Sequence, residues 1–452
     1  GSISTLPLFI EGAPRRGEGV RFFIFNFQFS IFNCSAQRVS LDECLEKALE
    51  SNFSIKIIRN EARMDKNNLN YSTFLPTLEG TVKQTQTRND TKTENSAGEV
   101  NKMSDVKTDN YTAGVALNWR IFDGLEMFTT HEKQKELLAM GELAVQQAVE
   151  NLILNVSAAY YNVLVQHHKL MAARHSLELS NERYDEARVR YKIGNRSGLE
   201  AQQAKIDLNT DSSTYVRQKE ALKSAYITLN KLMNTDLQMV NYVQDTILLG
   251  PQLALGTLEQ KTLAGNTTLL IAKKDQKISA LDLKNARAVL FPTLDFNSGY
   301  NYNKTDTPSS STTLNRSNGF YWGFSLNVPI FSRLQNRTKI KNAKLELENT
   351  ELSYQEAEKE TLGDLALMYN SYENNLLMVN FEIESASVAE ANLDAALEKY
   401  KIGSLSGIEF REFQRSYIDA VDRKLSAIYQ AKVSELSLLL LSGDIRGSFV
   451  VE

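Results

Sequence analysis

The sequence predicts an α+β membrane protein in which four strands per chain are joined to very long coiled-coil helices, with an internal two-fold repeat. Three observations predict this fold class. A ten-residue stretch occurs twice, four segments alternate between apolar and polar residues, and two spans of 66 residues contain no proline. Each half of the chain therefore contains two strands and one long helical hairpin.

Composition excludes several classes of function. The 452 residues carry 51 basic and 55 acidic side chains, a net charge of −4, so nucleic acid is not expected as a partner. No stretch reaches the ~18 consecutive apolar residues that a membrane-spanning helix needs. No phosphate-binding loop, nucleophile elbow or dinucleotide-binding motif occurs. We therefore expect no enzyme activity, no cofactor and no metal site.

Residues 1–36 have the pattern of a signal peptide. Basic residues precede the apolar run 22–32, and small residues follow it up to Ala36, which is the order of an export signal cleaved after Ala36. The alternation of Asn26 and Gln28 with apolar neighbours also fits a strand, and this alternative stays open. Cys34 lacks the preceding small residue of a lipoprotein site, so a lipid anchor there is not expected.

The repeat covers most of the chain. YKIGNRSGLE (191–200) returns as YKIGSLSGIE (400–409), 400 − 191 = 209 residues later, and seven of the ten letters are identical. Two further pairs match upstream: LNWRIFDG (117–124) with LNVPIFSR (326–333), and FLPTLEG (74–80) with LFPTLDF (290–296). The predicted divisions are a first repeat over 37–240, an equatorial linker over 241–257, a second repeat over 258–445 and a tail over 446–452.

The alternating segments predict four strands, near 76–90, 109–121, 292–304 and 318–330. In the last of them Phe320, Trp322 and Phe324 alternate with small and polar residues. An apolar face with aromatic residues suits a barrel with lipid outside and water inside. A soluble sheet that packs this face on a core predicts the same pattern. The polar segments between paired strands, 85–109 and 303–318, are expected to be solvated, mobile loops.

The proline-free spans predict long helices over 125–190 and 334–399. Each would measure about 100 Å at ~1.5 Å per residue, which is wider than a compact domain. Apolar side chains recur every seventh residue: Val163, Leu170, Leu177, Tyr184 and Tyr191 in the first helix, and Tyr372, Val379, Ala386, Leu393 and Tyr400 in the second. A seven-residue repeat indicates coiled-coil packing, so these helices are expected to pack on one another.

The repeated ten-residue stretch predicts the turn of each hairpin. Gly194 and Gly403 stand where a helix end needs a left-handed residue. Ser197 and Ser406 are expected to cap the following helices, with Glu200 and Glu409 completing a capping box in each. The predicted tips are 191–198 and 400–407, and the predicted return helices are 199–232 and 408–441.

Four strands cannot close a transmembrane barrel, because known barrels begin at about eight strands. Open strand edges are not tolerated in lipid. Three copies of the chain would supply twelve strands. The sequence therefore predicts an oligomer, with a shared barrel that the helices continue as a tunnel.

This arrangement resembles the TolC-like outer-membrane efflux family, the outer membrane factors of tripartite export systems, over about residues 38–445. The duplication, the two PTL junctions, the two LN–IF junctions and the two glycine turns carry the resemblance. It implies a homotrimer with a twelve-stranded barrel in the lipid of the bacterial outer membrane and a helical tunnel in the periplasm. It also implies a periplasmic adaptor at the tips and an inner-membrane pump, expected to be of the RND type.

The resemblance assigns roles to residues near the tips. The adaptor-contact positions are Gly194, Ser197, Gly198, Leu199, Gly403, Ser406, Gly407 and Ile408. The two carboxylates of the entrance constriction fall on Glu409 and Glu412. Helix capping explains Glu409, since Glu200 stands at the matching position of the first repeat. It does not explain Glu412, whose counterpart in the first repeat is Gln203. Six carboxylates from three copies would repel one another and bind cations, although two solvated surface glutamates explain the same residues.

The resemblance also implies a closed-state latch made of an acid, a tyrosine and an arginine. Glu200 and Tyr400 occupy the acid and tyrosine positions. The arginine position holds Leu405, which puts the ionic part of the latch in doubt, and Arg196 on the other tip is the candidate substitute.

The expected function is passive export of small molecules through a duct that opens at its periplasmic tips. The same duct in type I protein secretion is an alternative that the sequence does not separate, because the pump selects the cargo. A non-channel coiled-coil scaffold is a further alternative, which the strand alternation and the leader disfavour.

Overall fold

The computed structural model describes residues 39–94, 96–194, 197–240, 246–308 and 313–448, all of which belong to one compact unit, Arg38–Glu452. The predicted leader, 1–36, and the end of the predicted tail lie outside the described residues. Within these ranges no helix is both long enough and apolar enough to cross a membrane.

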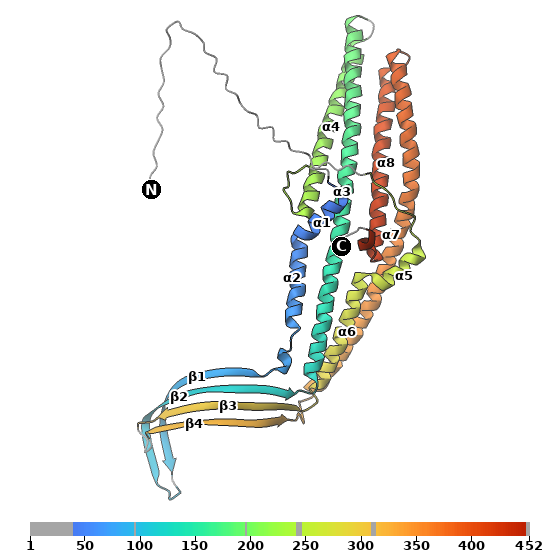
Figure 1. The fold of residues 1–452 in the computed structure, drawn as a ribbon. Helices are drawn as coiled ribbons and strands as arrows, with labels where there is room; N and C mark the ends of the chain where they lie inside the picture. The colour runs from blue at the N-terminus through green and yellow to red at the C-terminus, as the bar shows by residue number, and fades with distance from the viewer. Residues whose placement is uncertain (1–38, 95, 195–196, 241–245, 309–312, 449–452) are drawn as a thin grey trace, which may run out of the picture. The chain divides into compact units, whose positions relative to one another are not determined.

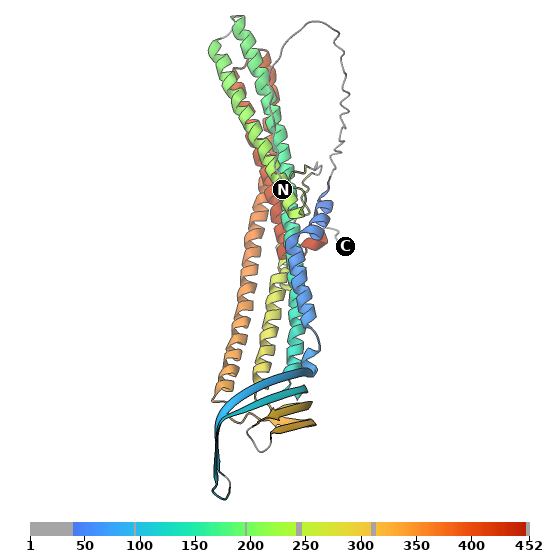
Figure 2. The same ribbon diagram turned by 90° about the vertical axis from the view of Figure 1, so that its left-hand side faces the viewer.

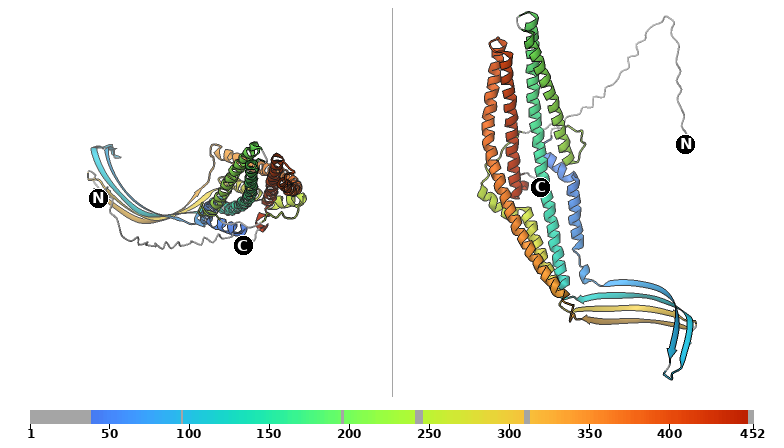
Figure 3. Two further views of the ribbon diagram at one scale, coloured as in Figure 1. Left: turned by 90° about the horizontal axis from the view of Figure 1, so that it is seen from above. Right: turned by 180° about the vertical axis from the view of Figure 1, so that it is seen from behind.

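Four antiparallel strands form one sheet in the order β1 (Thr77–Glu94), β2 (Val100–Phe122), β3 (Thr293–Asp306) and β4 (Leu314–Asn327). The two repeats meet where β2 pairs with β3, in a register that sets Asn118 opposite Asn297. Seen from above, the strands form a curved sheet (Figure 3). This sheet contains the four strands per chain that the sequence predicts.

The prediction of a polar loop over 85–109 is wrong, because β1 and β2 continue through most of it as a two-stranded ribbon. Polar side chains pair across the ribbon: Gln84 Nε2 donates to the Tyr111 hydroxyl at 2.8 Å, and Gln86 Nε2 donates to Asp109 Oδ1 at 2.7 Å. Such pairs stabilise a strand without an apolar face. The ribbon bends beyond the edge of β3 and β4, where the register shifts between Asn89 and Thr91 (Figures 1 and 2).

The predicted bounds of the fourth strand are also wrong by a few residues. β4 begins at Leu314 instead of 318 and ends at Asn327 instead of 330. Pro329 follows the end of the strand, and proline cannot donate a hydrogen bond to a neighbouring strand. β4 begins earlier than predicted because polar residues of the predicted loop 303–318 pair with β3. The polar residues of 85–109 lengthen β2 in the same way.

Two helices of 67 residues dominate the chain, α3 (Glu126–Lys192) and α7 (Gln335–Lys401). Each turns back into a shorter helix, α4 (Gly198–Met233) after α3 and α8 (Gly407–Leu441) after α7. We call α3–α4 the first hairpin and α7–α8 the second hairpin. The hairpins lie side by side through contacts between α3 and α8 (Figure 1).

The sheet-proximal parts of the long helices have other partners. There α2 (Phe53–Asn68) packs on α3, and α6 (Thr267–Ala288) packs on both α3 and α7. A short 3₁₀ turn, η1 (Ser72–Phe74), leads from α2 into β1. Each long helix begins directly after a left-handed residue, Leu125 (φ 75°) and Leu334 (φ 64°), so the chain reverses sharply between strand and helix.

The predicted coiled-coil register holds for the second hairpin only. Its members, Tyr372, Val379, Ala386, Leu393 and Tyr400, are all buried. In α3 the predicted register is wrong, since Tyr191 is exposed and only Val163 of its members is buried. The buried seven-residue pattern there is instead Ala173, Ser176, Ser180, Arg183 and Ala187. Its small and polar side chains carry no apolar signal in the sequence.

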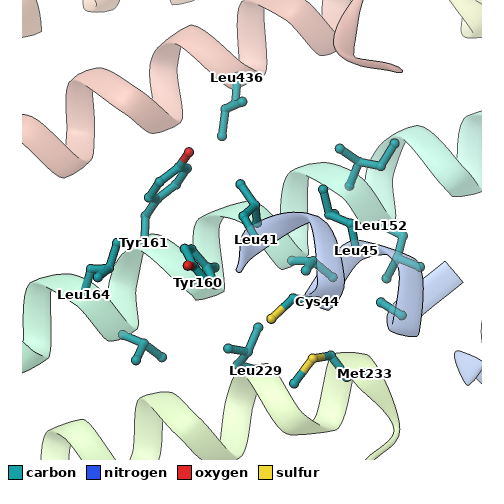
Figure 4. Close-up of a cluster of buried hydrophobic side chains, with 14 of the residues drawn as sticks. Leu41, Cys44, Leu45, Leu152, Tyr160, Tyr161, Leu164, Leu229, Met233 and Leu436 are labelled. Atoms are coloured by element: carbon teal, nitrogen blue, oxygen red, sulfur yellow. The ribbon is translucent and has the colours of Figure 1, made fainter. Parts of the chain in front are cut away.

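A hydrophobic core (Figure 4) joins the hairpins to α1 (Leu41–Ser51), which lies near the middle of the helical part (Figure 1). Leu45 of α1 and Tyr160 of α3 are fully buried there, next to Met233 of α4 and Leu436 of α8. Helix α5 (Leu255–Gly265) begins inside the predicted linker, and η2 (Ile445–Ser448) begins at the last residue of the predicted second repeat. This core holds the two hairpins together at one end. Contact between their tips therefore depends on other interactions.

Candidate functional site between the hairpin tips

The capping box predicted at the second turn is confirmed. Ser406 Oγ accepts from the Glu409 amide at 3.2 Å, and Glu409 Oε2 accepts from the Ser406 amide at 2.9 Å. The box predicted at the first turn is wrong, because Ser197 Oγ accepts from Leu199 at 3.2 Å and the Glu200 carboxylate is directed toward the second hairpin. A Cβ on Gly407 would lie 3.6 Å from Glu200 Oε1.

The capping box makes the start of α8 sensitive to acid. Hydrogen bonds from the backbone and side chain of Ser406 lower the pKa of Glu409 below its ordinary value of 4.5. A carboxylate whose pKa is lower in the folded state stabilises that state above its unfolded pKa, and this contribution is lost as the pH falls through the folded pKa. We expect hydrogen-exchange protection of the first turn of α8 to decrease below about pH 4.5 in the wild type.

Glu409→Gln should keep the cap, since glutamine also serves at this position, and should remove the dependence of protection on pH between 7 and 3. Glu412→Gln is the matched control, because Glu412 is exposed on the next turn of the same helix and should leave the wild-type dependence intact. Equal pH dependence in the wild type and Glu409→Gln would contradict the assignment.

A cavity of about 340 Å³ lies between the two turns. Seven of the twelve predicted tip, entrance and latch residues line it: Ser197, Leu199, Glu200, Tyr400, Ser406, Gly407 and Ile408. The other five, Gly194, Gly198, Gly403, Glu409 and Glu412, do not line it. Gly194 and Gly403 have φ values of 74° and 77°, so they provide the left-handed turns.

Tyr400 is buried at this cavity, and its hydroxyl has no hydrogen-bond partner within the described part of the chain. Its ring stacks on Phe410 at a centroid distance of 5.3 Å. Burial raises the pKa of Tyr400 and the charge of Glu186 raises it further, against the opposing charges of Arg190 and Arg183. The phenol is therefore neutral at physiological pH.

The predicted acid and tyrosine of the latch line one cavity without a hydrogen bond to the Tyr400 hydroxyl. Near the Tyr400 cavity, two arginines of α3 contact the second hairpin. Arg190 lies 5.3 Å from the Tyr400 ring centroid, and Arg183 Nη1 donates to the Gly407 carbonyl at 3.2 Å. The suggested substitute, Arg196, lies outside the described residues.

A buried ion pair connects the two hairpins below the cavity. Arg411 of α8 binds Asp211 of α4 through two hydrogen bonds, Nη1 to Oδ2 at 2.6 Å and Nη2 to Oδ1 at 2.8 Å. Both side chains are mostly buried, at 16% and 8% exposure. Burial alone would lower the pKa of Arg411, but the hydrogen bond and the charges of Asp211 and Asp207 raise it, so Arg411 stays charged.

The polar groups around this pair are satisfied by α3. Gln414 Nε2 of α8 donates to the Ser176 carbonyl at 2.8 Å and to Ser180 Oγ at 3.0 Å. The hydroxyls of Ser176 and Ser180 in turn donate to Asp211 Oδ2. We call these five residues, Ser176, Ser180, Asp211, Arg411 and Gln414, the cross-hairpin network. A buried charge is tolerated when it is paired and hydrogen-bonded in this way.

The predicted entrance glutamates lie outside the cross-hairpin network. Glu409 and Glu412 are exposed and three residues apart, so they share the outer face of the first turns of α8. Arg411 and Gln414 lie on the opposite face, against the first hairpin. One helix therefore carries acidic groups on its exposed face and the interhairpin contact on its buried face.

A family model described as outer membrane efflux protein matches residues 44–235 and 258–444, which is most of the described chain. The chain belongs to the outer membrane efflux protein family. The resemblance drawn from the sequence is thus confirmed, and with it the location in the outer membrane. The family consists of export channels rather than enzymes, and the non-channel scaffold is set aside.

Relatives and solved structures of the efflux family agree with the fold. The cation efflux system protein CusC of Escherichia coli K12 is 23% identical over 335 residues, which are 71% of this chain and 70% of CusC. The probable outer membrane lipoprotein SilC of Salmonella typhimurium is 22% identical over 346 residues, 74% of this chain and 73% of SilC. The outer membrane channel CmeC of Campylobacter jejuni superimposes with a TM-score of 0.76 at 18% identity, over 90% of this chain and 86% of CmeC.

Sequence reasoning missed the cross-hairpin network of this efflux protein. Asp207 and Asp211 are spaced i, i+4 on α4, and Arg411 and Gln414 are spaced i, i+3 on α8, which are ordinary patterns of a solvated helix. The available signal was the small-residue pattern in α3 that contains Ser176. A seven-residue repeat of small side chains marks a face that a neighbouring helix approaches closely.

Proposed function

We propose that the chain is the exit duct of a tripartite efflux system, which passively conducts small molecules from a periplasmic adaptor and an inner-membrane pump, of the RND type, to the exterior. A homotrimer would supply twelve strands to a barrel in outer-membrane lipid and six hairpins to a periplasmic tunnel. The cross-hairpin network carries this proposal, because it joins two hairpins that must separate for a tunnel to open at its tips.

Opening would move the second hairpin outward from the first. This movement breaks the contacts that cross between them, namely Arg411 with Asp211 and Arg183 with the Gly407 carbonyl. Contacts inside each hairpin, such as the buried pair of Arg183 and Asp207, are kept. The conformational change is therefore confined to one helix interface, with the central hydrophobic core as its fixed end.

The adaptor would supply the free energy for opening by binding at the tips. Leu199 and Ile408 are 72% and 77% exposed and lie on opposite sides of the tip cavity. Exposed apolar side chains at the rim of a cavity are a suitable contact for a partner helix. Adaptor binding that favours the separated hairpins shifts the population of the duct toward the open state.

At the entrance we propose that Glu409 and Glu412 of three chains form a ring of carboxylates. Both groups are exposed on one helix face, and like charges brought together attract multivalent cations. Glu409 is partly committed to its capping box, so Glu412 supplies the freer carboxylate.

Single-channel conductance in a planar bilayer tests this proposal. We expect a small, steady conductance from the wild type, blocked by multivalent cations added on the helical side. The double substitution Glu409→Ala with Glu412→Ala should remove the block. Glu356→Ala with Glu360→Ala is the matched control, since both residues are exposed on the long helix α7 far from the tip.

The outcomes separate the parts of the proposal. Channels whose block is unchanged in the entrance variant would refute the carboxylate ring and leave the duct intact. Reproducible absence of channels from membrane-inserted protein would refute the duct. Type I protein secretion uses the same duct with another inner-membrane component, so it shares this test.

A further inference from the structure

The start of α7 carries a concentration of positive charge. Residues 333–344 contain five basic and no acidic side chains. We call these the basic patch: Arg333, Arg337, Lys339, Lys341 and Lys344. All five are exposed, and none makes an ion pair or a side-chain hydrogen bond with the described residues.

The equivalent segment of the first repeat is charged quite differently. At the 209-residue offset, the five positions hold Gly124, Phe128, Thr130, Glu132 and Lys135, of which only the last is basic. The start of α3 also has acidic residues of its own, and its lysine at position 133 is bonded to a carboxylate of α6 at 2.6 Å. Acidic residues therefore balance the positive charge at the start of the long helix in the first repeat, and they do not in the second repeat.

Positive charge at this place is unfavourable within the chain. The start of a helix bears a partial positive charge from the aligned peptide dipoles, which acidic side chains normally offset. The first turn of α7 contains no acidic residue. Five cations within three turns therefore repel one another and the helix end, and the cost is offset only when an anionic partner is present.

The basic patch directly follows an apolar surface. Val328, Ile330, Phe331 and Leu334, in the short connection from β4 to α7, are all exposed. The exposed aromatic residues of β4, such as Trp322, precede them. An apolar and aromatic surface followed by basic residues is the order found across a membrane–water interface. The chain belongs to an outer-membrane family, so this surface adjoins lipid.

We propose that the basic patch binds the phosphate headgroups of anionic phospholipids in the leaflet that faces the helical part of the protein. The headgroup layer is about 6 Å thick on each side of the bilayer. At ~1.5 Å per residue, Arg337 and Lys339 lie within about 6 Å of the helix start, and Lys344 lies about 14 Å along it, within reach of its extended side chain.

Three members of the patch share one side of the helix. Arg337, Lys341 and Lys344 follow an i, i+4, i+7 spacing, next to the half-buried side of α7 that contains Ile340. Their combined charge can therefore meet one lipid surface. Each basic group close to an anionic membrane contributes roughly a fivefold preference for anionic lipid, and salt screens it.

The chain offers a built-in probe for the test. Its two tryptophans, Trp119 and Trp322, both lie on the sheet, in β2 and β4. The full-length protein is reconstituted into phosphatidylcholine bilayers that contain increasing fractions of brominated phosphatidylglycerol. Quenching of tryptophan fluorescence then reports the association of anionic lipid relative to neutral lipid, and brominated phosphatidylcholine gives the reference.

We expect the wild type to prefer phosphatidylglycerol by about fivefold or more at low salt and to lose most of this preference at ~1 M salt. The variant Arg337→Gln, Lys341→Gln, Lys344→Gln should lower the preference at low salt by about fivefold or more, with any remainder due to Arg333 and Lys339. The matched control is Lys219→Gln, Lys223→Gln, Lys231→Gln, which removes three exposed charges from α4 and should behave as the wild type.

An unchanged preference in the patch variant would overturn the proposal, as would an equal loss in the control. Reversal potentials, measured on the same proteins, test whether the patch lines the water-filled lumen instead. If the patch lined the water-filled lumen, its removal would shift the channel toward cation selectivity while the lipid preference stayed at the wild-type value. That result would also overturn the proposal.

Discussion

Asp211→Ala is expected to raise the resting conductance of the channel and to weaken the contact between the hairpins by about 3–5 kcal/mol. The substitution leaves Arg411 charged, buried and without its carboxylate, and it removes the acceptor shared by Ser176 and Ser180. An unpaired buried charge is costly, so the second hairpin should move until Arg411 reaches water. Single-channel recording measures the conductance, and hydrogen exchange of α8 amides measures the local opening.

Two controls make this prediction specific. Asp211→Leu with Arg411→Met replaces the pair by apolar groups, and it should restore the low conductance, because such swaps are often neutral or stabilising. Asp422→Ala removes another contact between α3 and α8, the ion pair with Lys169 at 2.6 Å, but Asp422 is 55% exposed. Its effect should be about 1 kcal/mol or less. Equal conductance in Asp211→Ala and Asp422→Ala would show that the cross-hairpin network does not hold the resting state.

Gly124→Ala should lower the yield of folded protein sharply, by a destabilisation of about 2–5 kcal/mol. Gly124 has φ 73°, and a Cβ there would lie 2.4 Å from the Ala288 carbonyl and 2.8 Å from Phe291 Cβ. The reversal from β2 into α3 is therefore pressed against the passage from α6 into β3. Alanine adds both an unfavourable backbone conformation and a clash with main-chain atoms that cannot move independently.

The matched control is Gly403→Ala at the tip of the second hairpin. Gly403 has nearly the same backbone conformation, φ 77°, but among the described residues, its chain neighbours aside, no atom lies within 4 Å of its added Cβ. Its cost should be the conformational one alone, about 1–2 kcal/mol. Thermal unfolding followed by circular dichroism, together with the amount recovered in outer-membrane fractions, compares the two. Equal shifts in the unfolding midpoint would contradict the role assigned to the junction.

The repeat, the long helices and the strand count were predictable because each depends on a sequence pattern that occurs in both halves of the chain. The second-hairpin register was equally accessible, since its interior residues, such as Tyr372 and Leu393, are large and apolar. The α3 register was not, because Ser176 and Ser180 face the partner helices with small polar side chains. Sequence patterns report the hydrophobic part of a helix contact and pass over the part made by hydrogen bonds.

The sequence predicted where the candidate site lies but only some of the residues that form it. Glycine and serine at the turns identify the tips, since their conformational preferences are local. The cross-hairpin network joins Asp211 to Arg411 across 200 residues of chain, so no local preference reveals it. The same limit applies to the β1–β2 ribbon, whose polar residues are held by cross-strand partners such as Gln86 and Asp109.

The equal length of α3 and α7 constrains how this gene can change. Insertion of seven residues into one helix would shift its tip by about 10 Å past the other, and Leu199 and Ile408 would no longer border one cavity. Viable insertions must therefore occur in both copies together, or in neither. The spacing within the present sequence agrees: the 209-residue offset is unbroken from the end of the strands to the tips. The seven-residue difference between the copies falls in the ribbon, where extra length has no counterpart to match.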